Sequence, residues 1–286
     1  MLHSLVFPVL LVCVAVIDGP VVETRQGKLR GRLETVSGQS VQVYSGIPYA
    51  EPPLHHLRFR RPLPVKSWLG TYDATQKKFS CPQQLYPLLF DIETDQSEDC
   101  LYLNVWTSST RQPKPVIVWI YGGFAFGSSY QSWYNGSLLS TMYDVVVVTF
   151  NYRLGIFGFL DAGASDAPGN VGLRDQRLAL QWVRENIHAF GGHPTRVTIF
   201  GESAGSYSVH AHIISPLSRG LFHRPIMMSG TYDSIGLLDT VFESAVRGSE
   251  VAARLNCTGP FLDLTSHSDI VLECLPASRR IHYLML

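Results

Sequence analysis

The chain has 286 residues, which is enough for one large domain or two small ones with a substantial hydrophobic core. Lysine plus arginine and aspartate plus glutamate number 23 each, so the formal net charge is zero and gives no reason to expect a nucleic acid as partner. Charged residues make up 16% of the chain and hydrophobic residues 45%, which excludes a disordered, collagen-like or coiled-coil protein.

Residues 5–17 form an apolar run that contains Pro8. The run is too short to span a bilayer but has the length of the hydrophobic region of a signal peptide. We therefore expect residues 1–19 to be a signal peptide and the protein to be secreted; a buried N-terminal strand is the alternative. No later stretch reaches 18 uninterrupted apolar residues, so we expect no transmembrane segment. Two glycosylation sequons, at Asn135 and Asn256, fit a secreted glycoprotein.

Four cysteines follow the predicted signal peptide, at Cys81, Cys100, Cys257 and Cys274. An even number in a secreted chain favours two disulfides, although four cysteines allow three pairings. We expect the local pairs Cys81–Cys100 and Cys257–Cys274, which close two short loops. Metal binding is the alternative, but no metal-ligand spacing supports it, and we expect no metal site.

The N-terminal third of the predicted domain is rich in turns. Residues 21–49 alternate short β-branched runs with glycines, which predicts antiparallel hairpins at a sheet edge. Residues 52–100 contain several prolines and the first cysteine pair, and we expect a long irregular region there.

The pattern changes after residue 101. Continuous apolar runs at residues 116–121, 145–150 and 197–200 are typical of strands buried on both faces. Residues 173–190 fit a helix that ends at two glycines. Buried strands that alternate with helices predict an α/β fold with a mostly parallel sheet, which the N-terminal hairpins make mixed. Toward the C-terminus we expect a strand near residues 226–229 and an amphipathic helix over about 238–255.

The third apolar run leads directly into the sequence Gly-Glu-Ser-Ala-Gly at residues 201–205. This is the G-x-S-x-G pattern of a nucleophile elbow, and residues 206–214 can begin the helix that the elbow requires. The glycines leave room for a sharp turn that holds the Ser203 hydroxyl above the sheet. A serine in an ordinary tight turn is the alternative, and the buried strand before the motif makes it the weaker one.

A glycine-rich turn, Gly122-Gly123, ends the first apolar strand. In hydrolases with this elbow, such a turn supplies backbone N–H donors to the oxyanion of a tetrahedral intermediate, and the N–H of Ala204 would add another. A phosphate-binding loop is the rival interpretation, but neither G-K-[ST] nor G-x-G-x-x-G is present. We expect no cofactor.

Longer motifs accompany these two turns: GIPYAEPP at residues 46–53, SEDCLYLNVW at 97–106, NYRLG at 151–155 and GNVGLRDQ at 169–176. Together they resemble the type-B carboxylesterase and cholinesterase family of α/β-hydrolases over residues 21–275. The resemblance implies an α/β-hydrolase fold that acts on a small ester substrate through an acyl-serine intermediate. It also implies the two local disulfides.

The resemblance further implies roles for individual residues. Ser203 is the expected nucleophile, Glu202 lies beside it, and Gly122, Gly123 and Ala204 form the oxyanion hole. Cholinesterases stack a tryptophan on a quaternary ammonium, and the corresponding position falls on Phe90. A phenylalanine face attracts a cation less strongly than a tryptophan face does.

The general base is missing from this pattern. In the α/β-hydrolase fold the acid and the histidine of the triad follow the serine, and in the family both lie on later strands, beyond residue 286. No histidine after Ser203 matches the base, whether His210, His212, His223, His267 or His282. We therefore expect residues 20–286 to be the N-terminal part of the domain and the isolated chain to be impaired. The alternative is a non-catalytic secreted protein that binds or adheres.

Overall fold

The computed structural model describes residues 19–83, 94–123, 125–232, 239–259, 264 and 266–275, so the predicted signal peptide lies outside it except for Gly19. The strands are β1 (Val21–Glu23), β2 (Lys28–Arg30), β3 (Arg32–Val36), β4 (Gln39–Pro48), β5 (Thr71–Asp73), β6 (Tyr102–Thr107), β7 (Lys114–Ile120), β8 (Val146–Phe150), β9 (Asp161–Ala164), β10 (Ala167–Pro168), β11 (Gly192–Glu202) and β12 (Arg224–Met228). The α-helices are α1 (Ser137–Tyr143), α2 (Gly155–Phe159), α3 (Val171–Asn186), α4 (Ala204–Ile214), α5 (Val241–Arg254) and α6 (Ser268–Cys274). Short 3₁₀ helices are η1 (His55–Leu57), η2 (Ser132–Tyr134), η3 (Ile187–Phe190) and η4 (Pro216–Ser218).

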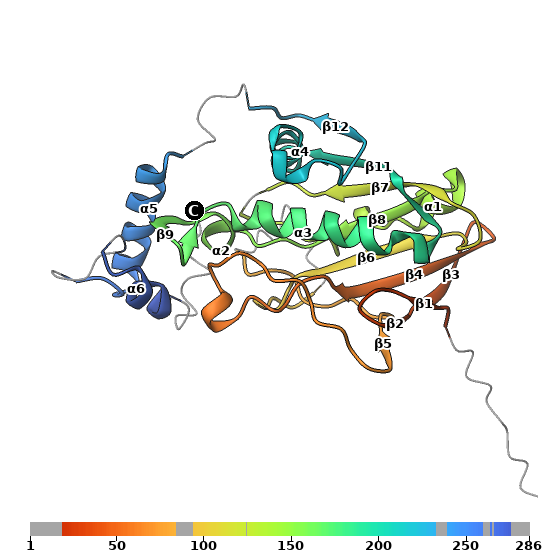
Figure 1. The fold of residues 1–286 in the computed structure, drawn as a ribbon, viewed down its shortest axis with the longest axis horizontal. Helices are drawn as coiled ribbons and strands as arrows, with labels where there is room; N and C mark the ends of the chain where they lie inside the picture. Colours follow the sequence, from red (N-terminus) through yellow and green to blue (C-terminus); the bar gives the residue numbers. More distant parts are fainter. Residues whose placement is uncertain are drawn as a thin grey trace, which may run out of the picture.

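A seven-stranded sheet in the order β12-β11-β7-β8-β6-β4-β3 forms the centre of the molecule (Figure 1). The strands from β12 to β8 are parallel, and β6, β4 and β3 continue the sheet in antiparallel register. The α/β fold with a mixed central sheet that contains a parallel part, predicted from the sequence, is therefore confirmed. Of the antiparallel hairpins predicted for residues 21–49, the pair β3 and β4 lies at one edge of this sheet. β1 and β2 instead join β5 in a separate three-stranded sheet.

Two hydrophobic clusters cover the two faces of the large sheet. On one face, Val118 of β7 and Val148 of β8 share the main core with Leu180 and Trp182 of α3. On the other face, Trp106 of β6 and Val147 of β8 form a smaller cluster with β4 residues, next to which α1 packs against β3, β4, β6 and β8. The sheet thus lies between α3 and α4 on one side and α1 on the other.

The expectation that all three apolar strands are buried on both faces is only partly correct. All five residues of β8 are buried. In β7 and over residues 197–200 of β11, however, buried and half-buried residues alternate. The neighbouring edge strand β12 is exposed along its whole length. The physical reason is that α1 covers the sheet from β8 to β3, whereas the same face of β7, β11 and β12 has less cover among the described residues.

Both predicted disulfides form. Cys81 pairs with Cys100, and Cys257 pairs with Cys274. The second disulfide joins the end of α6 to the segment after α5, and this unit packs on α2 and β9 through Phe157, Leu160 and Ala162. Within the described ranges, no helix combines the length and the hydropathy needed to cross a bilayer.

A buried ion pair connects three parts of the fold at the end of β8. The Arg153 guanidinium donates to Asp175 from Nε at 2.8 Å and from Nη2 at 2.7 Å, and its Nη1 donates to the carbonyl oxygen of Arg58 at 2.7 Å. The side chains of Arg153 and Asp175 are 2% and 0% exposed. Since a buried charge that loses its partner is strongly unfavourable, this pair is a point at which the fold is sensitive to substitution.

We predict that Asp175→Asn lowers the free energy of unfolding by about 3–5 kcal/mol, because it leaves the Arg153 charge buried without a counter-charge. Urea denaturation measures the loss. The matched control is Asp239→Asn, which removes the partner of Arg247 at 3.1 Å in a pair where Arg247 is 70% exposed. That control should cost less than about 1 kcal/mol, and equal losses for the two variants would contradict the prediction.

Candidate active site

Ser203 lies at the junction of β11 and α4, as the elbow motif predicts. Its backbone has φ 52° and ψ −119°, a conformation that an L-residue adopts only at a local energetic cost. Hydrogen bonds on both sides hold it there: the Ser203 N–H donates to Met228 O at 2.9 Å, and Ser203 O accepts from Tyr207 N at 3.0 Å. The Ser203 residue is half-buried.

The two glycines of the motif allow β7, β11 and α4 to approach one another. A Cβ atom at Gly205 would lie 2.0 Å from the carbonyl oxygen of Ile120, and one at Gly201 would lie 2.5 Å from Gly205. Neither position has room for a side chain. The spacing of glycines around Ser203 therefore follows from backbone packing at the end of the sheet.

The glycine turn after β7 lies against the elbow. A Cβ atom at Gly122 would be 2.7 Å from Glu202 O, 3.3 Å from Ser203 Cβ and 3.5 Å from Ala204 N. Gly123 has φ +105°, which favours glycine. The structure thus brings Gly122 beside Ser203 and Ala204, as expected for an oxyanion hole; Phe124, the next residue of the turn, lies outside the described residues.

The segment after the glycine turn is fixed by polar side chains from distant parts of the chain. The Gln83 amide donates to Gly127 O at 2.9 Å and accepts from Gly127 N at 2.7 Å. The Asn151 Oδ1 accepts from Ser129 N at 2.8 Å. Gln83 follows Cys81 by two residues, so the first disulfide loop directly supports the turn. No local sequence pattern indicates these contacts.

Glu202 is exposed at the end of β11 and lies near an aromatic cluster that sequence reasoning missed. The ring centroid of Trp119 is 5.1 Å from that of Tyr134 and 4.8 Å from that of Phe200. Burial raises the pKa of the Tyr134 hydroxyl, and the negative charge of Glu202 raises it further. Alternation of large aromatic residues on β7 and β11 is the only sequence signal that could have indicated this cluster.

The histidines near the elbow have structural partners. His212 is buried, and its Nε2 lies 3.0 Å from Gln176 Oε1 while its Nδ1 lies 2.8 Å from Ser218 Oγ. Because the Gln176 oxygen can only accept, the Nε2 carries the proton. Gln176 in turn donates to Ser208 at 3.0 Å, and Ser208 donates to the carbonyl oxygen of Ala204 at 2.9 Å. A continuous buried network therefore connects His212 to the first residue of α4.

No hydrogen bond joins Ser203 Oγ to a histidine or a carboxylate within the part of the chain that the structure describes. His210 Nδ1 accepts from Tyr232 N at 3.1 Å and its ring stacks on Tyr232 at 4.8 Å. The arrangement therefore presents a strained serine and a glycine turn without a base at hydrogen-bond distance.

The remaining predicted site residues are placed as follows. Asn135 and Asn256 are both exposed. Phe90 and His282 lie outside the described residues, so the predicted cation-facing role of Phe90 stays a prediction.

A serine elbow at the carboxyl end of a parallel strand, in a mixed sheet covered by helices, is characteristic of the α/β-hydrolase fold. The profile of the carboxylesterase family matches residues 18–284. The chain therefore belongs to the carboxylesterase family and has its α/β-hydrolase fold.

The chain is similar in sequence to two acetylcholinesterases of this family. The chain is 46% identical over 261 residues to the acetylcholinesterase of Bungarus fasciatus, an alignment that covers 86% of this chain and 43% of the relative. It is 49% identical over 251 residues to the acetylcholinesterase of Danio rerio, covering 83% of this chain and 40% of the relative. The chain thus spans less than half the length of these relatives.

The buried network beneath the elbow predicts a pH-dependent stability. Burial lowers the pKa of His212 from 6.5 to about 4, and the positive charge of Arg177 contributes to the shift. Between these values the unfolded chain binds the proton and the folded chain does not, so the contribution of neutral His212 is complete above pH 6.5 and declines as the pH falls toward 4. We predict that the free energy of unfolding of the unaltered chain falls by about 2 kcal/mol more between pH 7 and pH 5 than that of His212→Gln, because the variant lacks this titrating group.

Urea denaturation at the two pH values measures this difference. His188→Gln, which changes an exposed histidine, serves as the control and should keep the pH dependence of the unaltered chain. An unchanged pH dependence in His212→Gln would contradict the assignment.

Proposed function

We propose that this chain carries the nucleophilic half of a carboxylic ester hydrolase of the cholinesterase type, with Ser203 as the nucleophile. The observation that carries the proposal is the strained backbone of Ser203, at φ 52°, directly against Gly122. Strain of this kind persists only where the surrounding structure enforces it, and it is concentrated at functional sites. Membership of the carboxylesterase family supports the same reaction class.

In the proposed reaction, Ser203 Oγ attacks the carbonyl carbon of the ester while a base removes the hydroxyl proton. The backbone N–H groups of Gly122, Gly123 and Ala204 stabilise the oxyanion of the tetrahedral intermediate, a contribution of roughly 10²–10³ in rate for each donor. The alcohol leaves with the proton, and water then hydrolyses the acyl-serine. Glu202, beside the nucleophile, places a negative charge at the mouth of the site. This chemistry needs no metal or organic cofactor.

We further propose that the 286 residues by themselves catalyse this reaction poorly. Serine is a weak nucleophile until a base takes its proton, and no described histidine forms a hydrogen bond with Ser203. The printed name of both relatives, acetylcholinesterase, makes choline esters the first substrates to test on a longer product. Trp119 and Tyr134 near Glu202 are aromatic faces of the kind that attract a cation.

A non-catalytic binding protein is the second candidate, and it is favoured because no described histidine or carboxylate is hydrogen-bonded to Ser203 Oγ. The two candidates differ in one respect. A hydrolase site that lacks only its base keeps the strained serine and the oxyanion donors, so an external base should restore reactivity. A binding protein does not need the oxyanion donors, so an external base is not expected to make its serine reactive.

We predict that imidazole accelerates the reaction of Ser203 with a fluorophosphonate by about tenfold or more, because it replaces the missing general base. In this reaction the serine oxygen bonds to phosphorus, fluoride leaves and imidazole accepts the proton. Mass spectrometry of the peptide that contains Ser203 measures the adduct. Ser203→Ala is the control for nonspecific labelling.

A folded chain that gains no adduct at Ser203 with or without imidazole would favour the binding protein. Rapid hydrolysis of p-nitrophenyl acetate by the chain alone, abolished in Ser203→Ala, would contradict the proposed impairment.

We also propose that the protein is secreted and glycosylated. Asn135 and Asn256 are exposed, and the Asn135 Oδ1 accepts from Ser137 N at 2.8 Å in a compact turn. The apolar segment at residues 5–17 and the two disulfides are consistent with an oxidising compartment.

For the chain expressed in cultured mammalian cells, we predict a secreted product whose mobility increases in two steps on partial digestion with a peptide N-glycosidase. Asn135→Gln and Asn256→Gln should each remove one step, since each removes one acceptor amide. Ser137→Ala and Thr258→Ala should reproduce these results. Mobility that the glycosidase leaves unchanged would contradict the proposal.

A further inference from the structure

Two arginines, Arg174 and Arg177, lie near the beginning of α3, the helix that crosses one face of the central sheet (Figure 1). They are three positions apart, so they share one face of the helix. Both are half-buried, whereas Asp175 and Leu178, which follow them in the chain, are buried. The two arginines therefore lie on the side of α3 that is turned away from the core.

A third arginine, Arg61, reaches the same end of α3 with the segment that follows η1. Arg153, which is ion-paired with α3, donates from Nη1 to the carbonyl oxygen of Arg58 at 2.7 Å. Arg60 Nη2 lies 2.9 Å from Asp166 Oδ1, in the turn between β9 and β10 that leads into α3. These contacts hold the segment beside the beginning of the helix, so Arg61 adds a third positive charge there.

The arginine cluster, defined as Arg61, Arg174 and Arg177, has no countercharge within the described part of the chain. No described carboxylate forms an ion pair with any of the three. The neighbouring carboxylates are already used in other ion pairs, which are Asp175–Arg153, Asp166–Arg60 and Glu98–Arg58. Three positive charges are therefore left in excess at this place.

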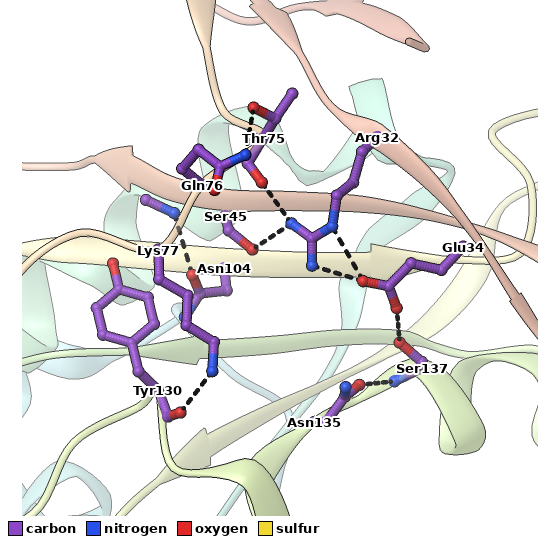
Figure 2. Close-up of polar contacts among 11 residues, drawn as sticks. Arg32, Glu34, Ser45, Thr75, Gln76, Lys77, Asn104, Tyr130, Asn135 and Ser137 are labelled. Carbon is purple, nitrogen blue, oxygen red and sulfur yellow. Dashed lines mark hydrogen bonds and ion pairs between the residues drawn. The ribbon is translucent and has the colours of Figure 1, made fainter. Parts of the chain in front are cut away.

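Arg32 shows how a half-buried arginine elsewhere in the fold is satisfied. Its Nε donates to Glu34 Oε1 at 3.0 Å and its Nη1 to Thr75 O at 2.6 Å (Figure 2). Arg174 differs, because its Nε is buried and has no hydrogen-bond partner. A buried donor without a partner is costly, and a guanidinium N–H can only donate. The missing partner is therefore an acceptor from outside the described residues.

The charge of the arginine cluster decides between water and an anion as this acceptor. Burial lowers the pKa of the Arg174 guanidinium below its usual value, and the positive charges of Arg61 and Arg177 lower it further. The three groups therefore repel one another, although arginines stay protonated at neutral pH. A water molecule accepts from Nε but leaves this repulsion in place. An anion accepts the same hydrogen bond and offsets the repulsion.

We propose that the arginine cluster binds a phosphate or sulfate group, with Arg174 Nε as the buried donor and Arg61 and Arg177 as the neighbouring charges. Guanidinium groups match the oxygens of such a group in pairs, and a tetrahedral oxyanion has enough acceptors for three arginines. Arg177 is already oriented, because its Nε donates to Leu217 O at 2.7 Å while its terminal nitrogens have no described partner. The proposal does not depend on the hydrolase function of Ser203.

A free ion and a group carried on an extended chain are two sources of this chemistry, and α3 allows them to be distinguished. Arg184 is exposed and lies seven positions after Arg177, two turns further along the same face, at a distance of about 10 Å. A free phosphate or sulfate ion contacts only the arginine cluster. A sulfated polysaccharide bound there reaches Arg184 as well.

Titration calorimetry of the full chain with sodium phosphate and with sodium sulfate, at constant low ionic strength in chloride, tests the proposal. We expect one site that saturates below about 1 mM for at least one of the two anions. Absence of saturation for both up to about 10 mM would overturn the proposal.

A sulfated hexasaccharide identifies the source of the group. If it binds more tightly than sulfate and loses this gain in Arg184→Gln, the bound group belongs to an extended chain. If it binds no more tightly than sulfate, and Arg184→Gln has no effect, the ligand is the free ion.

Matched variants locate the site. Arg174→Gln and Arg61→Gln should each weaken binding of the saturating anion by about tenfold or more, because each removes a charged hydrogen-bond donor. Arg61 is exposed and has no described partner, so its substitution tests binding without disturbing the fold. Arg111→Gln makes the same change at another exposed position and should leave the affinity unchanged. Equal affinity in all three variants would overturn the assignment.

A measurement on the unaltered protein keeps the test independent of how the variants fold. The Nε–H resonance of Arg174, identified by its absence in Arg174→Gln, should shift as the anion is added, whereas that of Arg111 should stay in place. Saturable binding that leaves the Arg174 resonance unmoved would show that the anion occupies another place and would overturn the proposed site.

Discussion

The buried pair of Arg153 and Asp175 is the interaction on which most of the fold depends. Arg153 follows β8, and Asp175 belongs to the first turns of α3, so their bond fixes the helix across the carboxyl ends of the parallel strands. The Arg153 carbonyl is equally confined, because a Cβ at Gly158 would lie 2.1 Å from it and one at Gly172 would lie 2.7 Å from it. Two buried charges are stable together only when they are paired closely and their remaining donors and acceptors form hydrogen bonds. The chain therefore has one arrangement in which β8, α2 and α3 can meet.

The proposed catalytic residues lie at the ends of neighbouring parallel strands that this arrangement holds together. β7 supplies Gly122, β11 supplies Ser203, and the carbonyl oxygen of Met228 at the end of β12 accepts from the Ser203 N–H. The strain in Ser203 is thus maintained by three strands and by α4, not by the elbow motif alone. In the same way, two hydrogen bonds between the Gln83 amide and the Gly127 backbone hold the segment after the glycine turn.

The features that could be predicted from the sequence are those that depend only on residues close together in the chain. The elbow lies within residues 201–205, and the apolar runs of β7, β8 and β11 mark strands of a parallel sheet. The strand β11 begins at Gly192, earlier than expected, because pairing of Gly192 with Lys114 extends the ladder through residues that have no apolar pattern. Interactions between distant segments, such as the electrostatic effect of Glu202 on Tyr134, cannot be recognised from a local sequence pattern. Solvent exposure on one face of β7 also depends on where α1 packs, and the apolar pattern of the strand does not reveal the position of that helix.

The strand β12 has a consequence for the behaviour of the chain in solution. Its outer backbone edge pairs with no other described strand, and Ile226, Met227 and Met228 are 50%, 41% and 36% exposed. A row of unpaired N–H and C=O groups beside apolar side chains is a template for the addition of another strand, and natural proteins protect such edges with charge, proline or a cover. Arg224 and Pro225 provide that protection only at its beginning. Colloidal stability of the 286 residues therefore depends on what occupies this edge, and self-association through β12 competes with the folded monomer as concentration rises.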